Sequence, residues 1–163
     1  MELTQERLKE LLDYDKDIGI FTWKQTRNGH VKKGNIAGWK TDHDYIKISI
    51  LYKTIFAHRL AWFYFYGKFP QYQLDHINGI RTDNRICNLR ECNNAENQQN
   101  QKKPQKINST GFLGVYPVYK SKNFRAKITI NKKTKHLGNF KTAIEAHDAY
   151  IKAKRELHEF NTL

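Results

Sequence analysis

The sequence has few of the features that mark membrane proteins and disulfide-rich proteins. No apolar run reaches the roughly 18 residues that a transmembrane helix needs, and no signal peptide opens the chain, so we expect no membrane partner. The chain has two cysteines, Cys87 and Cys92, which are too few for a disulfide framework and lack the companion ligands of a zinc site. These absences favour a protein of the reducing cytoplasm.

Acidic residues are also scarce. The 163 residues include 29 Lys and Arg against 16 Asp and Glu, a formal net charge of +13. The surplus is uneven, because residues 1–100 hold 15 basic and 12 acidic side chains, whereas residues 101–163 hold 14 and 4. A polyanion is therefore the expected partner, above all for the C-terminal third. A basic surface that only maintains solubility is the alternative.

The hydrophobic pattern predicts an α+β protein with two domains. In the N-terminal domain, residues 1–102, we expect a helix over 3–14 and a small antiparallel sheet from strands over 18–24 and 45–57. A second helix over 58–70 should be closed by Gly67 and stopped by Pro70. Residues 103–111 are polar and basic without periodicity, so they predict a linker.

The C-terminal domain, residues 112–163, should be a three-stranded antiparallel sheet packed on one helix. Three strands are separated by turn residues, and Thr142 with Glu145 three positions on predicts a capping box at the start of the helix. Along the middle strand, apolar side chains alternate with Arg125, Lys127 and Thr129. One face should therefore pack on the helix, while the opposite, basic face is free to bind a ligand.

Residues 73–101 concentrate Asp, His and Asn where a core would need apolar side chains. Strands "LDHI" and "LREC" followed by a helix from Asn93 predict a β-β-α unit. In that geometry oxygens of Asp75 and Asn97 can converge on one cation, and such ligands suit Mg²⁺ or Mn²⁺. His76 alternates to the other side of the strand and can act as a base toward water. A base and a cation are what phosphodiester hydrolysis requires.

About residues 10–101 resemble the HNH endonucleases of the phage and homing type, on "AHRLAWFYFYGKFP" and "DHINGIRTDNRICNLRECNNAENQQN". The resemblance implies a DNA endonuclease with one divalent metal ion, Mg²⁺ or Mn²⁺, encoded by a phage and acting in the cytoplasm of a bacterial host. It implies that His76 is the general base and that Asn88 tethers the loop presenting it. Asp75 and Asn97 would be the metal ligands.

The segment 114–157 resembles the DNA-binding domain of plant ethylene-response factors, the APETALA-two type, in its order of three strands and a helix and in "LGNF" and "EAHDAY". That resemblance implies that the exposed face of the sheet enters the major groove. Two positions where the plant domains read bases with arginine are Tyr116 and Val118, so contacts here should go mainly to phosphates. The implied contacts are Tyr116, Val118, Lys120, Arg125, Lys127 and Thr129.

Several assignments remain open at this stage. Arg81, Arg85 and Arg90 are candidate phosphate contacts, although Arg81, like its neighbours in the turn, is of a kind that often only shapes a loop. His58 fits a capping or buried role better than catalysis. For the whole chain we expect double-stranded DNA as partner and a monomer, with dimerisation on DNA as the alternative. A non-catalytic DNA-binding regulator on a degenerate nuclease scaffold, or an RNA-binding protein, are the competing functions.

Overall fold

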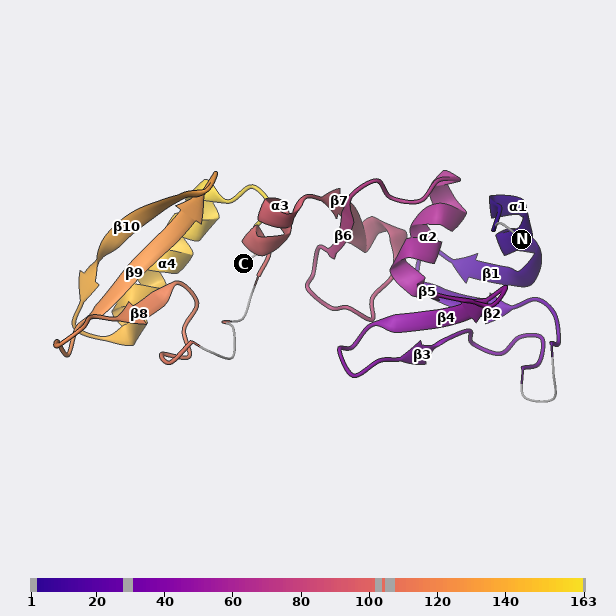
Figure 1. Ribbon diagram of the computed structural model, residues 1–163, viewed down its shortest axis with the longest axis horizontal. Helices are drawn as coiled ribbons and strands as arrows, with labels where there is room; N and C mark the ends of the chain where they lie inside the picture. The colour runs from indigo at the N-terminus through magenta and orange to yellow at the C-terminus, as the bar shows by residue number, and fades with distance from the viewer. Residues whose placement is uncertain (1–2, 28–30, 102–103, 105–107, 163) are drawn as a thin grey trace. The chain divides into compact units, whose positions relative to one another are not determined.

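The computed structural model describes residues 3–27, 31–101, 104 and 108–162, and the chain divides into two compact units, residues 1–93 and 94–163 (Figure 1). Both are α+β, which confirms the predicted fold class. Part of the predicted linker, residues 103 and 105–107, lies outside the described residues. The domain limits at 102 and 112 therefore stay a prediction. Among the described residues no helix is long and apolar enough to cross a membrane.

The first unit opens with a helix and a hairpin. Helix α1, Gln5–Leu11, is capped by the Thr4 side chain, which accepts from the Arg7 backbone N–H. The expected continuation to residue 14 was wrong, because β1, Leu12–Asp15, follows at once and pairs antiparallel with β2, Ile20–Trp23. Burial along β1 alternates between inward and outward residues, and that period of two is satisfied only by a strand.

A second sheet and a helix complete the core of this unit. Strands β3, Trp39–Lys40, β4, Ile46–Ile50, and β5, Lys53–Phe56, form an antiparallel sheet in the order β3-β4-β5. Helix α2, Ala57–Tyr66, ends as predicted at Gly67, which takes the left-handed conformation. The side chains buried most completely come from both sheets and both helices: Leu8, Leu12, Phe21, Ile48, Ile50 and Leu60.

The segment singled out in the sequence forms a hairpin in the first unit. Strand β6, Gln73–His76, pairs antiparallel with β7, Leu89–Cys92, and a short 3₁₀ turn, η1, Ile86–Asn88, leads into β7. In this register Asp75 lies opposite Arg90 and His76 opposite Leu89. The hairpin therefore places an acid and a base of the predicted site on neighbouring positions of one strand.

The second unit begins with the short helix α3, Asn94–Gln99. Hydrogen bonds join the end of α3 and the residues after it to the C-terminal part of the same unit. The Lys154 ammonium donates to the Gln101 backbone oxygen, the Phe160 backbone N–H donates to the Gln99 side chain at 3.3 Å, and Thr162 donates to Asn100 at 2.6 Å. Lys154 is only 1% exposed, so its ammonium is held by acceptors rather than by water.

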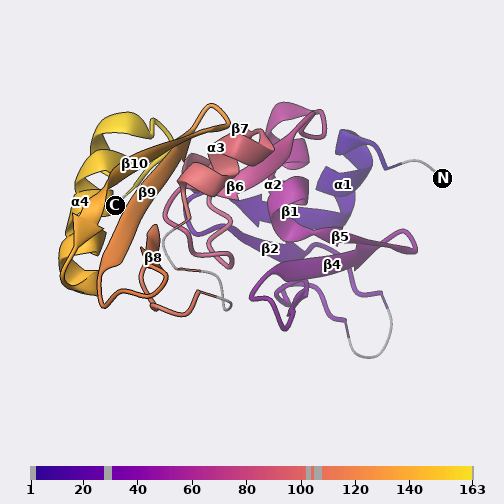
Figure 2. The same ribbon diagram turned by 60° about the vertical axis from the view of Figure 1, so that its left-hand side comes forward.

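The rest of the second unit is the predicted sheet with one helix. Strands β8, Val115–Pro117, β9, Phe124–Ile130, and β10, Lys133–Phe140, form an antiparallel sheet in the order β10-β9-β8. Helix α4, Ala143–Leu157, starts with the capping box of Thr142 and Glu145 and lies along one face of the sheet (Figure 2). Its buried residues pack on the inward residues of the strands: Val115, Ala126, Ile128, Ala146, Tyr150 and Ala153.

Candidate functional site

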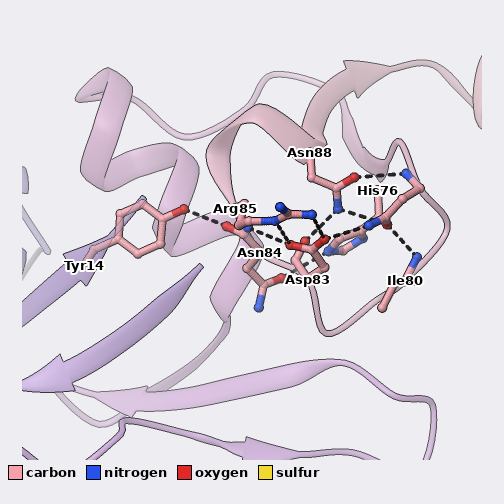
Figure 3. Close-up of polar contacts among 8 residues, drawn as sticks. Tyr14, His76, Ile80, Asp83, Asn84, Arg85 and Asn88 are labelled. Carbon is pink, nitrogen blue, oxygen red and sulfur yellow. Dashed lines mark hydrogen bonds and ion pairs between the residues drawn. The ribbon is translucent and has the colours of Figure 1, made fainter. Parts of the chain in front are cut away.

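The loop between β6 and β7 is tied together by Asn88. Its side-chain oxygen accepts from the Asn78 backbone N–H at 2.9 Å (Figure 3). Its amide nitrogen donates to the Asn78 side chain at 3.1 Å and to the Asp83 backbone oxygen at 2.8 Å. Asn88 is itself buried. One amide thus joins the two halves of the loop, although its contribution to catalysis stays a prediction.

The loop is also held by an ion pair between Asp83 and Arg85 (Figure 3). The guanidinium donates to both carboxylate oxygens at 2.8 and 2.6 Å, and Asn78 donates to the same carboxylate at 2.6 Å. The bonds from Arg85 lower the pKa of Asp83, so the carboxylate stays ionised. Arg85 was predicted to contact DNA. Here its guanidinium closes the loop, while 44% of the side chain remains exposed.

His76 ends β6 with a buried ring. Its Nε2 lies 3.1 Å from the side-chain oxygen of Asn84, and the backbone oxygen of Asn84 accepts from the Tyr14 hydroxyl at 2.6 Å (Figure 3). Burial lowers the pKa of His76, and the bond to Asn84 opposes that shift. A neutral imidazole is the form that can accept a proton. The sequence suggested His76, but it gave no sign that Asn84 and Tyr14 hold it.

A second histidine lies against the first. The ring centroids of His58 and His76 are 5.2 Å apart with the rings nearly perpendicular, and His58 also contacts Phe56 and Tyr45 at 5.3 and 5.5 Å. The His58 Nδ1 is buried without a hydrogen-bond partner among the described residues. Burial lowers the pKa of His58 to about 3, so the ring is neutral. His58 is thus buried and does not cap α2, whose N-cap is Phe56.

Asp75 is buried next to His76 and bonded to Arg90. The guanidinium donates to one carboxylate oxygen from Nε at 3.1 Å and from Nη2 at 2.9 Å. Arg90 was predicted to reach a phosphate, but it pairs with Asp75 across the hairpin, with only 22% of its side chain exposed. An ion pair this buried is stable only if both partners stay hydrogen-bonded. A cation at Asp75 would therefore share the carboxylate with Arg90 or displace it.

The donors present fit a hard cation with few protein ligands. Within the described part of the chain, no three His, Cys, Asp or Glu side chains come together in a group that could hold a metal. Mg²⁺ commonly takes one or two carboxylates and completes its shell with water and substrate phosphates. Asp75 provides one such carboxylate. The other predicted ligand, Asn97, is half-buried on α3 in the second unit, so the ligand pair remains a prediction.

One exposed cation of the loop stays beside the histidine pair. The Arg81 guanidinium stacks on the Tyr45 ring at 4.9 Å and donates to the His43 backbone oxygen at 3.1 Å. Tyr45 in turn contacts His76, with ring centroids 6.1 Å apart. Stacking on an aromatic face leaves the edge of a guanidinium available for an anion. Of the three arginines predicted here, Arg81 is the one without an ion-pair partner among the described residues.

The outward face of the C-terminal sheet gathers the residues predicted to contact DNA. Arg125 and Thr129 are exposed and Lys127 is half-buried, with its ammonium 4.1 Å over the Tyr116 ring. Lys120 is exposed in the turn after β8. Sequence reasoning missed the contribution of β10. Its register adds one neighbour for each cation, His136 opposite Lys127 and Asn139 opposite Arg125.

Comparison with known proteins agrees with this geometry. Residues 56–99 match the family model described as HNH endonuclease. The matched segment runs from the end of β5 through α2 and the β6–β7 hairpin to α3, and so includes His58, Asp75, His76, Asn88 and Asn97. The match supports an HNH nuclease. Neither the curated proteins nor the solved structures searched contain a match to this chain.

Proposed function

We propose that the protein is a divalent-metal-dependent endonuclease that hydrolyses phosphodiester bonds in double-stranded DNA, with His76 as general base. The observation that carries the proposal is a buried neutral imidazole, hydrogen-bonded to Asn84 and adjacent to the carboxylate of Asp75, inside the segment that matches HNH endonucleases. A base must be unprotonated and fixed in orientation, and this ring meets both conditions.

The reaction assigned to His76 is activation of water. The imidazole accepts a proton while the water oxygen forms a bond to phosphorus. The bond from phosphorus to the 3′ oxygen breaks, and that oxygen takes a proton from solvent. The products are a 5′-phosphate and a 3′-hydroxyl.

HNH nucleases generally use a divalent metal, and we assign the ion to Asp75 and Asn97. When bound, Mg²⁺ or Mn²⁺ would neutralise the negative charge that develops on the leaving oxygen. In this proposal Asp75 binds through its carboxylate and Asn97 through its amide oxygen. The two hydrogen bonds from the Arg90 guanidinium hold the Asp75 carboxylate in place on β6.

We assign the holding of DNA to the outward face of the C-terminal sheet. Its cations, Arg125 and Lys127, face away from α4, and residues 101–163 carry 14 basic against 4 acidic side chains. No base-reading pair of arginines lies on this face, so its contacts go mainly to phosphates and supply affinity more than sequence choice. In this proposal the C-terminal domain targets the nuclease to DNA.

The test is cleavage of supercoiled plasmid with Mg²⁺ or Mn²⁺. Nicking or linearisation that EDTA abolishes is expected of the full chain. His76→Ala should lower the rate by about 10²–10⁴-fold, the range for a positioned base, while DNA binding stays near normal. Asp75→Ala and Asn97→Ala should raise the metal concentration needed for half-maximal cutting.

The matched control is His43→Ala, because His43 is an exposed histidine of the same unit whose side chain lies outside this network. It should cut at the wild-type rate. Near-normal turnover by His76→Ala at saturating metal would contradict the assignment of the base. Binding without any cutting by the wild-type chain would instead favour a DNA-binding regulator, and preferential binding of single-stranded RNA would favour an RNA-binding protein.

A further inference from the structure

The β1–β2 hairpin contacts the loop that carries Asn84 at two points. The Tyr14 hydroxyl donates to the backbone oxygen of Asn84 at 2.6 Å in the protein interior. At the hairpin turn, Gly19 lies so close to the loop that a Cβ built on it would be 2.4 Å from the Arg85 backbone nitrogen. Gly19 has a φ of +73°, and only glycine combines this angle with so close an approach. The hairpin lies outside the segment that matches HNH endonucleases.

Tyr14 is a fixed and permanent donor. Its ring packs on Phe21 at 4.6 Å and on Tyr64 at 5.6 Å between centroids. Burial raises the pKa of Tyr14 well above its ordinary value, so the hydroxyl keeps its proton throughout the working pH range. The Tyr14 hydroxyl can therefore donate to the Asn84 carbonyl without a change in its own protonation state.

Asn84 links Tyr14 to His76 through its backbone oxygen and its side-chain oxygen. Asn84 is 2% exposed. Its backbone oxygen accepts a hydrogen bond from the Tyr14 hydroxyl, and its side-chain oxygen is hydrogen-bonded to His76 Nε2. An amide oxygen only accepts, so Nε2 must carry the ring proton and Nδ1 is then the basic nitrogen. The position of Asn84 thus decides both the orientation and the tautomer of His76.

We propose that Tyr14 and Asn84 are positioning residues for His76, so that the β1–β2 hairpin is a working part of the cleavage site. Tyr14 fixes the backbone of Asn84, and Asn84 fixes the imidazole as the Nε2–H tautomer (Figure 3). The catalytic side of this inference rests on the proposed function, because the orientation of His76 affects cleavage only if His76 is the base. The tautomer does not depend on cleavage.

The first test is nitrogen-15 NMR of the imidazoles in the full chain, with the His76 signals assigned by their loss in His76→Gln. The wild-type protein should show His76 as the Nε2–H tautomer. Asn84→Ala should give a mixture of tautomers, and Tyr14→Phe should shift the same signals part of the way. A wild-type Nδ1–H tautomer, or unchanged His76 signals in both variants, would overturn the proposal.

The second test is the kinetics of plasmid nicking. Tyr14→Phe removes one hydroxyl and leaves the packed ring, so kcat should fall about tenfold with KM within about twofold. Asn84→Ala should lower kcat about a hundredfold, and the double variant should be no slower than Asn84→Ala, because Tyr14 acts through Asn84. The matched control is Tyr52→Phe, because Tyr52 is an exposed tyrosine of the same unit. It should keep the wild-type kcat.

The outcomes separate the two proposals. Independent losses that multiply in the double variant, or a wild-type kcat for Tyr14→Phe, would overturn the positioning role while leaving the nuclease intact. If the NMR spectra are as expected but the wild-type chain does not cut, the proposed nuclease function is contradicted, while the hydrogen bonds from Tyr14 through Asn84 to His76 are supported. Thermal melting of each variant shows whether a loss comes from unfolding.

Discussion

The buried histidine beside the site makes the first unit sensitive to acid. Burial lowers the pKa of His58 from 6.5 to about 3 in the folded protein, with the charge of His76 and that of Arg59 as smaller causes. Between these values the unfolded chain binds a proton that the folded chain excludes. The free energy of unfolding must therefore fall as the pH falls below about 6.5. At about 1.4 kcal/mol per pH unit, lowering the pH from 6.5 to 4.5 removes roughly 2–3 kcal/mol through this one group.

The variant His58→Phe isolates the contribution of His58 to the pH dependence of the free energy of unfolding. Phenylalanine keeps an aromatic ring against Phe56 and Tyr45 but cannot titrate, and it removes the buried Nδ1 that has no partner among the described residues. At pH 7 the variant should be as stable as the wild-type protein or more stable, since an unpaired buried polar atom costs about 1–3 kcal/mol. At pH 4.5 it should be the more stable of the two by a further 2–3 kcal/mol or so.

The measurement is urea unfolding of the full chain followed by tryptophan fluorescence at both pH values. All three tryptophans lie in residues 1–93, so the signal reports on the first unit. The carboxylates are present in both proteins and their contributions cancel in the difference, which therefore measures His58 together with its interactions with His76 and Arg59. If the two proteins lose the same stability between pH 7 and 4.5, His58 is solvated or protonated in the folded state, and the reasoning is wrong.

Two further predictions concern the second unit. Arg125→Gln with Lys127→Gln should weaken DNA binding and reduce the slope of log K against log salt by about 0.9 for each phosphate that the variant no longer neutralises, whereas a charge-matched change on α4 should not alter binding by more than its effect on net charge. Gly114→Ala should destabilise this unit by roughly 2 kcal/mol or more, because φ is +73° and the added Cβ would lie 2.0 Å from the Tyr150 ring. Gly111→Ala is its control, with similar φ and nothing within 4 Å, and thermal melting followed by circular dichroism should separate the two. The charge-matched α4 control replaces two exposed cations, Lys152 and Arg155.

The C-terminal sheet and helix could be predicted because each local signal agrees with the others. Alternation along β9 assigns its two faces, the turn residues between β9 and β10 take positive φ, and Thr142 with Glu145 marks the start of α4. The end of α1 carries no such agreement. Leu11 and Leu12 are both apolar and both buried, so a helical and an extended continuation read alike until the hairpin partner is known.

The roles of the arginines in the central loop depended on register rather than on residue type. Arg90 lies opposite Asp75 because β6 pairs with β7 at that offset, and a shift of one residue would have turned the guanidinium to the other face. Arg85 reaches back two residues to Asp83, a local interaction that the sequence allowed but did not require. From composition alone, Arg85 and Arg90 are both available positive charges, whereas in the fold Arg85 pairs with Asp83 and Arg90 pairs with Asp75.

Tyr14 and Asn84 mark where sequence reasoning about the site reached its limit. They are 70 positions apart, and their hydrogen bond depends on a hairpin turn that passes over the loop with no side chain at Gly19. The match to HNH endonucleases starts at residue 56 and cannot include this hairpin. Yet a hydrogen bond to the Asn84 carbonyl fixes the backbone that orients the amide, and the amide meets the imidazole. The residues that hold His76 therefore extend beyond the segment that matches HNH endonucleases, because orientation is set by every rigid neighbour of the loop.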